Sequence, residues 1–229
     1  MRTRIAAGVF GVLLAVPAGA QVFRWTDSQG RVHYGDRPPQ QEKAKPVDTG
    51  RMDTSTTGER SGDVTVHPTE VEWFAIRGTT RDHMRASMQH TAPYSERRGS
   101  RVWGQCQWDI KWKFKHRREP GSCRIGEVRL DVTATMKLPR WVDEDQGNAQ
   151  LRAQWNDFSR RLRQHEDGHK NNGIAAARDL VRRLKGLGEF PSCELLDAEI
   201  RRQGERVISE YQQLDLAFDR VDLLYLTGF

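Results

Sequence analysis

The sequence predicts an α+β protein in which an antiparallel sheet packs on one long helix and on a second helix antiparallel to it. Residues 102–114 and 128–136 alternate apolar and polar side chains, which is typical of half-buried strands. Residues 151–187 repeat apolar side chains every three or four positions, which is typical of a helix with one buried face. Residues 191–214 predict the second helix. A small β-hairpin module precedes this domain.

Residues 1–20 have the layout of a secretory signal peptide. Arg2 and Arg4 precede a short apolar run, and a small-residue AGA sequence ends at Ala20. The run is too short to cross a bilayer, and no other stretch approaches the ~20 apolar residues that a membrane helix needs. We therefore expect an exported chain, periplasmic or secreted, without a transmembrane segment. Removal of the signal lowers the formal net charge from +6 to +4.

The hairpin module is predicted over residues 21–40 and a flexible linker over residues 41–68. Apolar and polar residues alternate on both sides of a DSQG sequence, where Gly30 can adopt the positive φ of a tight turn. His33, alone on its strand, is expected to pack against the neighbouring strand rather than to bind a ligand. The linker is rich in Pro, Gly, Ser, Thr and charge. It therefore has too little apolar surface to offset the entropy lost on folding.

The main domain is predicted over residues 69–229. Its first strand is VEWFAIRG, and a helix with a threonine cap follows Gly78. A hairpin centred near residue 119 joins the two alternating stretches and places Cys106 opposite residue 132. Cys106 and Cys123 are then too far apart to be bonded to each other.

Basic residues and tryptophans are interleaved over residues 97–118, a composition found in nucleic-acid-binding surfaces. In the alternating strand, however, Trp108 and Trp112 share one face and Lys111 and Lys113 share the other. We therefore expect the tryptophans to lie in the core, the lysines to face solvent, and no nucleic acid to be bound.

Both histidines of the sequence HEDGH lie on the apolar stripe of the long helix. This stripe runs through Leu151, Trp155, Phe158, Leu162, His165 and His169. His165 and His169 are therefore expected to face the core one helical turn apart. The second helix begins after a Ser192 cap and returns antiparallel to the first.

The H-E-x-x-H spacing predicts a zinc site. Neutral imidazoles of His165 and His169 are suited to bind Zn²⁺ while leaving a position for water, and Glu166 is suited to act as general base toward that water. The alternative is an ordinary pair of hydrogen-bonded core histidines. In that alternative Glu166 is a surface carboxylate that pairs with Arg163 or Lys170.

Gly168, inside the motif, is expected to leave room beside the ion. The longer metzincin motif requires a glycine and a histidine at the positions that Asn172 and Ala175 occupy here. That class of zinc enzyme is therefore excluded, and a third protein ligand has to come from another part of the chain.

The second helix or the segment after it is expected to supply this ligand. If the two helices fold back about residue 189, His169 faces roughly residue 209 and His165 roughly residue 213. Glu194 and Asp197 are then more than about 15 Å from the histidines at 1.5 Å per residue. The remaining candidates are Glu210, Asp215, Asp219 and Asp222, of which we favour the last two.

The main domain resembles the family known as domain of unknown function 922, described as predicted secreted zinc-dependent proteases. The shared landmarks are Trp108 and Trp112, Cys123, LPRW at 138–141, Trp155 and Phe158, HEDGH, and Cys193. The resemblance implies a zincin-like fold with the motif helix beneath a sheet, a Cys123–Cys193 disulfide and an unpaired Cys106. The W-x-D-x-x-G-x-x-H-Y-x-D-R-P run near the N-terminus resembles domain of unknown function 4124.

The chain departs from this family toward its C-terminus. Family members tend to finish with a Y-D-x-x-T-x-H-G type segment. Here Asp219 is retained, but Asp222 and Leu224 stand where the threonine and the histidine would fall. A histidine ligand in that segment would therefore be replaced by another group in this protein.

The sequence as a whole predicts an exported zinc-dependent metallopeptidase that hydrolyses peptide bonds of a peptide or protein substrate through a metal-activated water. The hairpin module would tether or position it at the cell envelope. The alternative is a noncatalytic periplasmic or cell-envelope binding protein with a structural or vestigial metal site. A third option is another zinc hydrolase, for instance an amidase acting on cell-wall peptides.

Overall fold

A computed structural model describes residues 23–26, 32–35, 45–46, 59–96 and 98–226 of the chain. The predicted signal peptide lies outside these residues, as does the DSQG turn. No helix in the described ranges combines the length and the apolar character needed to cross a membrane.

The two strands predicted for the hairpin module are present. β1 (Phe23–Thr26) pairs antiparallel with β2 (Val32–Gly35), and Trp25 lies opposite His33. β3 (Lys45–Pro46) pairs with the other edge of β1.

The main sheet begins inside the stretch that was predicted to be a linker. β4 (Glu59–Ser61) pairs antiparallel with β5 (Val64–Val66), and β5 joins the long strand β10. Val64 is buried in the main core, which gives this short segment enough apolar contact to become ordered.

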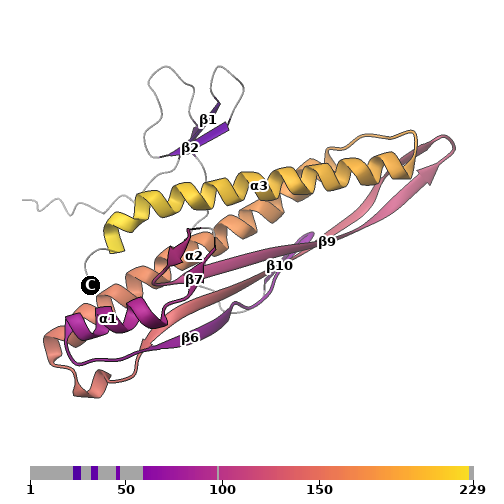
Figure 1. The fold of residues 1–229 in the computed structure, drawn as a ribbon. Coiled ribbons are helices and arrows are strands. Elements are labelled where there is room, and N and C mark those ends of the chain that lie inside the picture. The colour runs from indigo at the N-terminus through magenta and orange to yellow at the C-terminus, as the bar shows by residue number, and fades with distance from the viewer. Residues whose placement is uncertain (1–22, 27–31, 36–44, 47–58, 97, 227–229) are drawn as a thin grey trace, which may run out of the picture.

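A long two-stranded ribbon forms the centre of the sheet (Figure 1). β9 (Gln105–Glu119) pairs antiparallel with β10 (Ser122–Trp141), as the alternation predicted. The predicted register was wrong, because Cys106 lies opposite Met136 and not residue 132. The turn is centred between Pro120 and Gly121 and not at residue 119, with φ of 77° at Gly121, and an irregularity between Ile125 and Glu127 shifts the register further.

The sheet is mixed, so the prediction of a purely antiparallel sheet was wrong. β6 (Glu70–Ile76) and β5 both run parallel to β10 on the side opposite β9. A parallel pair needs a long crossover connection. The segment from α1 (Arg81–Thr91) through β9 provides it between β6 and β10.

α1 and a short hairpin follow β6. Thr80 caps α1 as predicted, because its hydroxyl accepts a hydrogen bond from the main-chain N–H of His83 at 3.3 Å. The hairpin consists of β7 (Tyr94–Ser95) and β8 (Ser100–Arg101) and leads directly into β9. α1 packs on β6, and its two methionines are buried beside the first half of the long helix.

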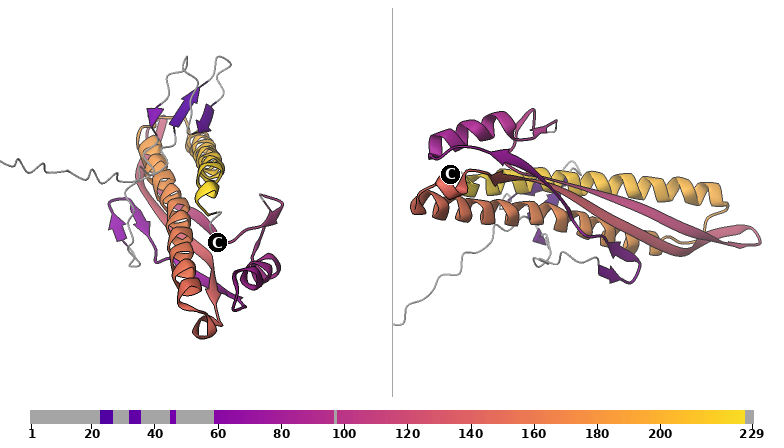
Figure 2. Two further views of the ribbon diagram at one scale, coloured as in Figure 1. Left: turned by 90° about the vertical axis from the view of Figure 1, so that its left-hand side faces the viewer. Right: turned by 90° about the horizontal axis from the view of Figure 1, so that it is seen from below.

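Two long antiparallel helices cover one face of the ribbon (Figures 1 and 2). α2 (Ala149–Lys185) begins at an Asn148 cap and ends at Gly186. α3 (Cys193–Leu226) begins after Ser192, as predicted. The apolar positions of β9 and β10 face these helices and the lysines of β9 face solvent, as predicted. The fold is therefore α+β, with a single layer of helices against the ribbon.

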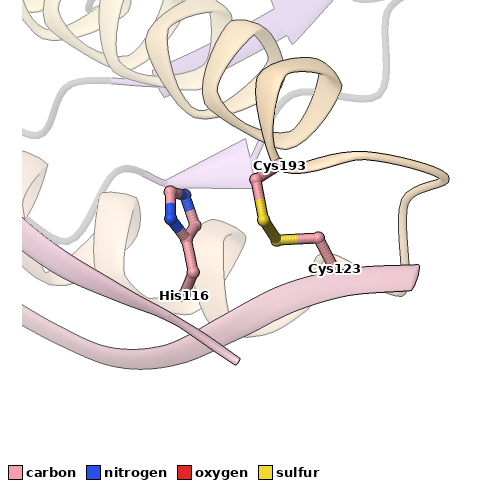
Figure 3. A group of neighbouring side chains, drawn as sticks. All are labelled: His116, Cys123 and Cys193. Atoms are coloured by element: carbon pink, nitrogen blue, oxygen red, sulfur yellow. A yellow bond between two sulfur atoms is a disulfide. The ribbon is translucent and has the colours of Figure 1, made fainter. Parts of the chain in front are cut away.

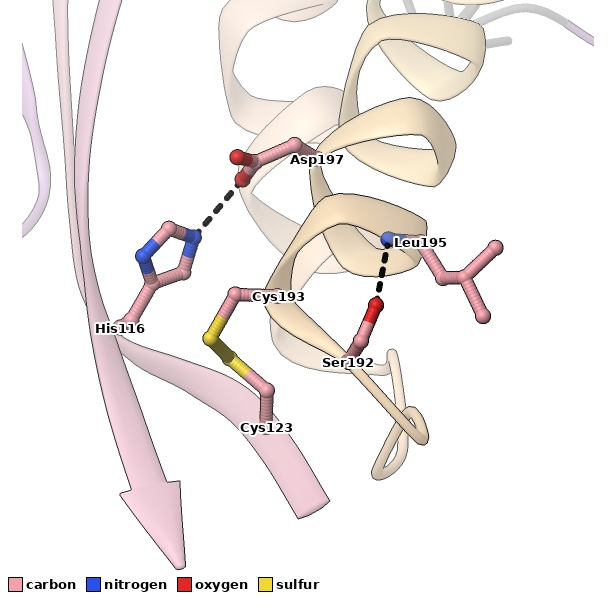
Figure 4. Close-up of a disulfide and its surroundings, with 6 residues drawn as sticks. All are labelled: His116, Cys123, Ser192, Cys193, Leu195 and Asp197. Carbon is pink, nitrogen blue, oxygen red and sulfur yellow. Dashed lines mark hydrogen bonds and ion pairs between the residues drawn. A yellow bond between two sulfur atoms is a disulfide. The ribbon is translucent and has the colours of Figure 1, made fainter. Parts of the chain in front are cut away.

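A disulfide joins Cys123 near the tip of the ribbon to Cys193 at the start of α3 (Figure 4). Cys106 is free, so the pairing implied by the family resemblance is present in the structure. Beside the bridge, Nε2 of His116 lies 2.7 Å from Oδ1 of Asp197. This end of the molecule therefore holds the start of α3 against the ribbon by a covalent bond and a polar contact.

Candidate metal centre

Two histidines of α2 bring their ring nitrogens close together. His165 and His169 are 6% and 7% exposed, and their Nε2 atoms lie 3.2 Å apart. The helix supplies this arrangement because residues four apart stand one turn above each other on the same face. The structure thus brings both predicted histidines together within the core.

Asp219 of α3 adds a third ligand atom to this pair. Its Oδ1 lies 3.1 Å from Nε2 of His165 and 3.0 Å from Nε2 of His169. Tetrahedral zinc bonds of about 2.0–2.1 Å separate neighbouring ligand atoms by roughly 3.3 Å, close to this triangle. Three such atoms, each carrying a lone pair when the imidazoles are neutral, repel one another unless a proton or a cation lies between them. The donor set therefore fits a divalent cation.

Asp215 fixes the orientation of one of the imidazoles. This carboxylate is 3% exposed and accepts hydrogen bonds from Nδ1 of His169 at 2.9 Å, Nε1 of Trp108 at 2.8 Å and Nδ2 of Asn172 at 2.8 Å. Because Nδ1 of His169 donates to Asp215, its Nε2 lone pair is free to bind a cation. Carboxylates behind metal-bound histidines commonly play this part.

The protonation state of His169 depends on these carboxylates. Burial by itself lowers its pKa, but the hydrogen bonds to Asp215 and Asp219 outweigh burial and raise the pKa to about 10. Without a metal, the His169 ring is thus protonated on both nitrogens and positively charged at neutral pH. A cation held by His165, His169 and Asp219 would supply the positive charge that this proton supplies in its absence.

Arg98, from the loop between β7 and β8, binds the carboxylate of Asp219. Its Nη2 lies 2.7 Å from Oδ1, and its Nε donates to Oδ2 at 3.2 Å. Burial by itself raises the pKa of Asp219, but hydrogen bonds from the two imidazoles and from Arg98 lower it below its ordinary value. Asp219 is therefore a fixed, ionised carboxylate.

Glu166 is buried, so the prediction of a surface carboxylate as the alternative role was wrong. It is 3% exposed, its Oε2 has no hydrogen-bond partner, and burial raises its pKa. Asp167, which is also buried, contacts the partners expected for Glu166 instead, with Nζ of Lys170 at 3.1 Å and Nε of Arg163 at 3.6 Å. A buried carboxyl group with a raised pKa and an unused oxygen is suited to exchange a proton with a bound molecule.

Two glycines shape the surroundings of the motif. A Cβ atom on Gly104 would lie 2.6 Å from Oε1 of Glu166, so this glycine gives the carboxylate its space. A Cβ atom on Gly168 would lie 2.5 Å from the ring of Phe218. The ring of Phe218 therefore fills the space beside Gly168 and stacks on His165 with ring centroids 4.9 Å apart. We had expected this space to lie beside an ion.

The described carboxylates that were candidates for a third ligand lie at different distances from the two imidazoles. Asp219 reaches both imidazoles, Asp215 lies behind His169, and Glu210 forms an ion pair with Arg183 at 2.6 Å. Asp222 lies in the last turns of α3, where the structure describes the main chain but not the side chains. Asp197 pairs with His116 at the far end of α3, as its distance along the helix predicted.

The predicted fold-back placed His169 opposite residue 209, whereas it meets Asp215. The connection between the helices causes this difference. Phe190 forms two main-chain hydrogen bonds with Cys123 near the tip of the ribbon, at 2.8 and 2.9 Å. The connection therefore carries the chain beyond the end of α2, and α3 needs additional residues to return to the histidines.

A cleft of about 930 Å³ opens beside the centre. Both histidines, Glu166 and Asp219 line it on the helical side, while Arg98 and the first residues of β9 line it on the other. The three ligand atoms and the buried carboxylate are thus accessible to a molecule bound in this cleft.

A second group of residues with metal-binding atoms lies at the disulfide. His116, Cys123 and Cys193 have ligand atoms within 4.8 Å of one another (Figure 3). Both sulfurs are consumed by the disulfide bond, which leaves one imidazole. Among the described residues, the group of His165, His169 and Asp219 is therefore the one that fits a metal.

Fold and site together define an α+β protein with a buried centre of two imidazoles and one carboxylate. The chain belongs to the family described as bacterial protein of unknown function (DUF922), whose sequence profile matches residues 71–223. The profile of domain of unknown function DUF4124 matches residues 12–61. No curated protein and no solved structure matches the chain.

Sequence reasoning missed three residues of the site. Arg98 precedes β9 in a loop with no recognisable motif, and Phe218 directly precedes Asp219 on α3. Gly104 interrupts the apolar alternation before β9, which was the one available sign of its special role. A break in an otherwise regular pattern often marks a close approach of two groups.

Proposed function

We propose that the protein is an exported zinc-dependent metallopeptidase of zincin-like architecture. The observation that carries the proposal is the convergence of His165 Nε2, His169 Nε2 and Asp219 Oδ1, each 3.0–3.2 Å from the other two, at a cleft. Two imidazoles and one carboxylate form a donor set that catalytic zinc sites use, with a fourth position left for water. A bound zinc ion would supply Lewis-acid activation of that water and of a substrate carbonyl.

Other residues of this chain orient the ligands and transfer the proton. Asp215 holds His169 in the tautomer whose Nε2 faces the cleft, and Arg98 holds Asp219. Glu166, adjacent to His165 on α2 and partly unpaired, accepts a proton from the attacking water and returns it to the leaving amine. Its raised pKa brings proton uptake and release closer to neutral pH.

The N-terminal residues and the disulfide support an oxidising compartment as the place of action. Residues 1–20 have the charged, apolar and small-residue sections of a signal peptide. A disulfide such as Cys123–Cys193 persists in the periplasm or outside the cell. We infer that the protein acts there on peptides or proteins.

Metal analysis and peptide hydrolysis test the proposal. Purified protein should contain close to one equivalent of zinc, lose it to a chelator, and hydrolyse peptide bonds only when the zinc is restored. Glu166→Gln should retain zinc but lose at least about a hundredfold in hydrolysis, because general base catalysis contributes on the order of 10²–10⁴. Glu205→Gln, on the exposed face of α3, should behave as wild type.

Three results would contradict parts of this proposal. Protein without a bound ion would remove the metal centre. Equal hydrolysis by Glu166→Gln and wild type would remove Glu166 from its role. Zinc binding without hydrolysis of any peptide would leave a noncatalytic envelope protein with a structural metal, which is the alternative that the sequence left open.

A further inference from the structure

We propose that the open edge of β9 beside the metal centre binds the substrate as an added β-strand. This inference rests on the proposed function and names its substrate class, which is an extended segment of polypeptide. Among the described residues, β9 pairs with β10 along one edge and with no strand along the other. Residues at the start of this strand also line the cleft.

The direction of the main-chain groups on β9 follows from hydrogen bonds on the far side of β10. The N–H of Leu130 donates to the C=O of Asp63, and the C=O of Val132 accepts from the N–H of His67. The main-chain N–H and C=O groups of even-numbered residues of β10 therefore point away from β9. Val142 continues this parity, because its N–H donates to Ile76. Main-chain groups of a strand alternate in direction, so odd-numbered residues of β10 point toward β9.

This parity leaves the main-chain groups of Cys106 and Trp108 without a partner strand. Gln107 and Cys106 lie opposite Thr135 and Met136 in the register of the ribbon. Opposite residues of an antiparallel pair either bond each other or both point away. Cys106 and Trp108 therefore present N–H and C=O groups to the open edge, about 6.8 Å apart.

These unpaired groups lie at the candidate centre. Cys106, Trp108, His165, Glu166 and His169 line the same cleft. A strand added along this edge therefore passes in front of the imidazoles and the buried carboxylate. Main-chain pairing of this kind recognises the extended backbone itself and is largely indifferent to side-chain sequence.

Charge varies along β9 in the way that such binding requires. Lys111, Lys113 and Lys115 are exposed on the half of β9 away from the centre, and lysines on edge strands discourage the addition of another strand. The corresponding positions beside the centre are Gln107 and Asp109. The strand is thus protected along one half and left open at the half that borders the cleft.

Amide hydrogen exchange tests the binding mode separately from catalysis. Zinc-loaded Glu166→Gln, labelled with ¹⁵N-tryptophan, is mixed with oxidised insulin B chain as an unfolded polypeptide probe. The amide of Trp108 should exchange at least about tenfold more slowly in the presence of the probe. Trp112 serves as an internal control, because its amide has the same direction but lies in the lysine-bearing half. Its exchange should not change.

Backbone methylation of the probe tests the same contact from the other side. Wild-type protein is used to locate the bond cleaved in the B chain, and a decapeptide around that bond is then made with one N-methylated amide at a time. Every second methylation on one side of the cleaved bond should lower kcat/KM by about fivefold or more, as expected for loss of one hydrogen bond. The intervening methylations should change kcat/KM much less.

Each outcome bears on a different part of the inference. Slowed exchange at Trp108 together with a period of two in the methylation series supports strand addition. Cleavage without either effect overturns strand addition and leaves the peptidase intact. Slowed exchange without cleavage supports peptide binding and overturns the peptidase. Slow exchange without the probe, together with a doubled mass in light scattering, assigns the edge to self-association and overturns the inference, as does the absence of both effects.

Discussion

Replacing Asp215 with asparagine should both weaken zinc binding and destabilise the metal-free protein. The carboxylate accepts three hydrogen bonds in the core, at 2.8, 2.8 and 2.9 Å. Asparagine has one acceptor oxygen. If that oxygen stays with His169 and Asn172, the amide nitrogen faces the indole N–H of Trp108, donor against donor. One bond to a charged group is lost and one buried donor is left unsatisfied, which together cost about 2–4 kcal/mol of unfolding free energy.

The effect on zinc follows from the loss of orientation at His169. Removing the carboxylate behind a metal-bound histidine typically weakens metal affinity about 10- to 100-fold. Each factor of ten reduces the stabilisation by saturating zinc by about 1.4 kcal/mol. Urea unfolding followed by tryptophan fluorescence, with chelator and with zinc, measures both quantities. Competition with a chromophoric chelator gives the affinity directly.

Asp197→Asn provides a matched control on the same helix. Asp197 also contacts a histidine, His116 at 2.7 Å, but both side chains are partly exposed and far from the centre. Its replacement should cost less than about 1 kcal/mol and leave zinc affinity unchanged. Wild-type zinc affinity in Asp215→Asn would refute the assignment of His169 as a ligand oriented by Asp215.

Three further predictions concern the same centre. Arg98→Ala should weaken zinc binding about tenfold in chelator competition because its carboxylate partner on α3 is no longer held, and Arg98→Lys should restore part of the loss. Gly104→Ala should cost about 1–3 kcal/mol in urea unfolding and lower hydrolysis, since its Cβ would lie 2.6 Å from Oε1 of Glu166. Gly188→Ala, with open space around its Cβ, should be neutral. In metal-free protein, the pKa of His169 near 10 means that its protonation stabilises the fold fully below about pH 6.5, and this contribution is lost as the pH rises to about 10. A flat stability profile across that window would contradict this assignment.

Local patterns in the sequence were sufficient for most elements of the fold. The alternation over residues 102–114 and 128–136 predicted the ribbon, and the threonine and serine caps predicted where α1 and α3 begin. The same patterns do not encode long-range pairing. The parallel contacts of β5 and β6 with β10, and the register that places Cys106 opposite Met136, depend on turns and a bulge that alternation does not reveal.

The candidate site shows the same division. His165 and His169 could be predicted because both lie on one helix, where spacing alone fixes their relation. Asp219 and Arg98 reach the centre from segments far away in the chain, so their positions depend on the path of the connection at Phe190 and on the loop between β7 and β8. Contacts of this kind follow from the assembled fold and not from any local motif.

The disulfide has a mechanical consequence for the opposite end of the molecule. About 33 Å of helix separates Cys193 from Asp215 at 1.5 Å per residue. The disulfide fixes α3 to the ribbon at the first residue of this long helix. A slip of this helix by one residue would displace its carboxylates by about 1.5 Å, half of the 3.0 Å that separates Asp219 from His169. Reduction of the disulfide would release the first residue of α3 and would therefore loosen the position of Asp215 and Asp219 at the candidate metal centre.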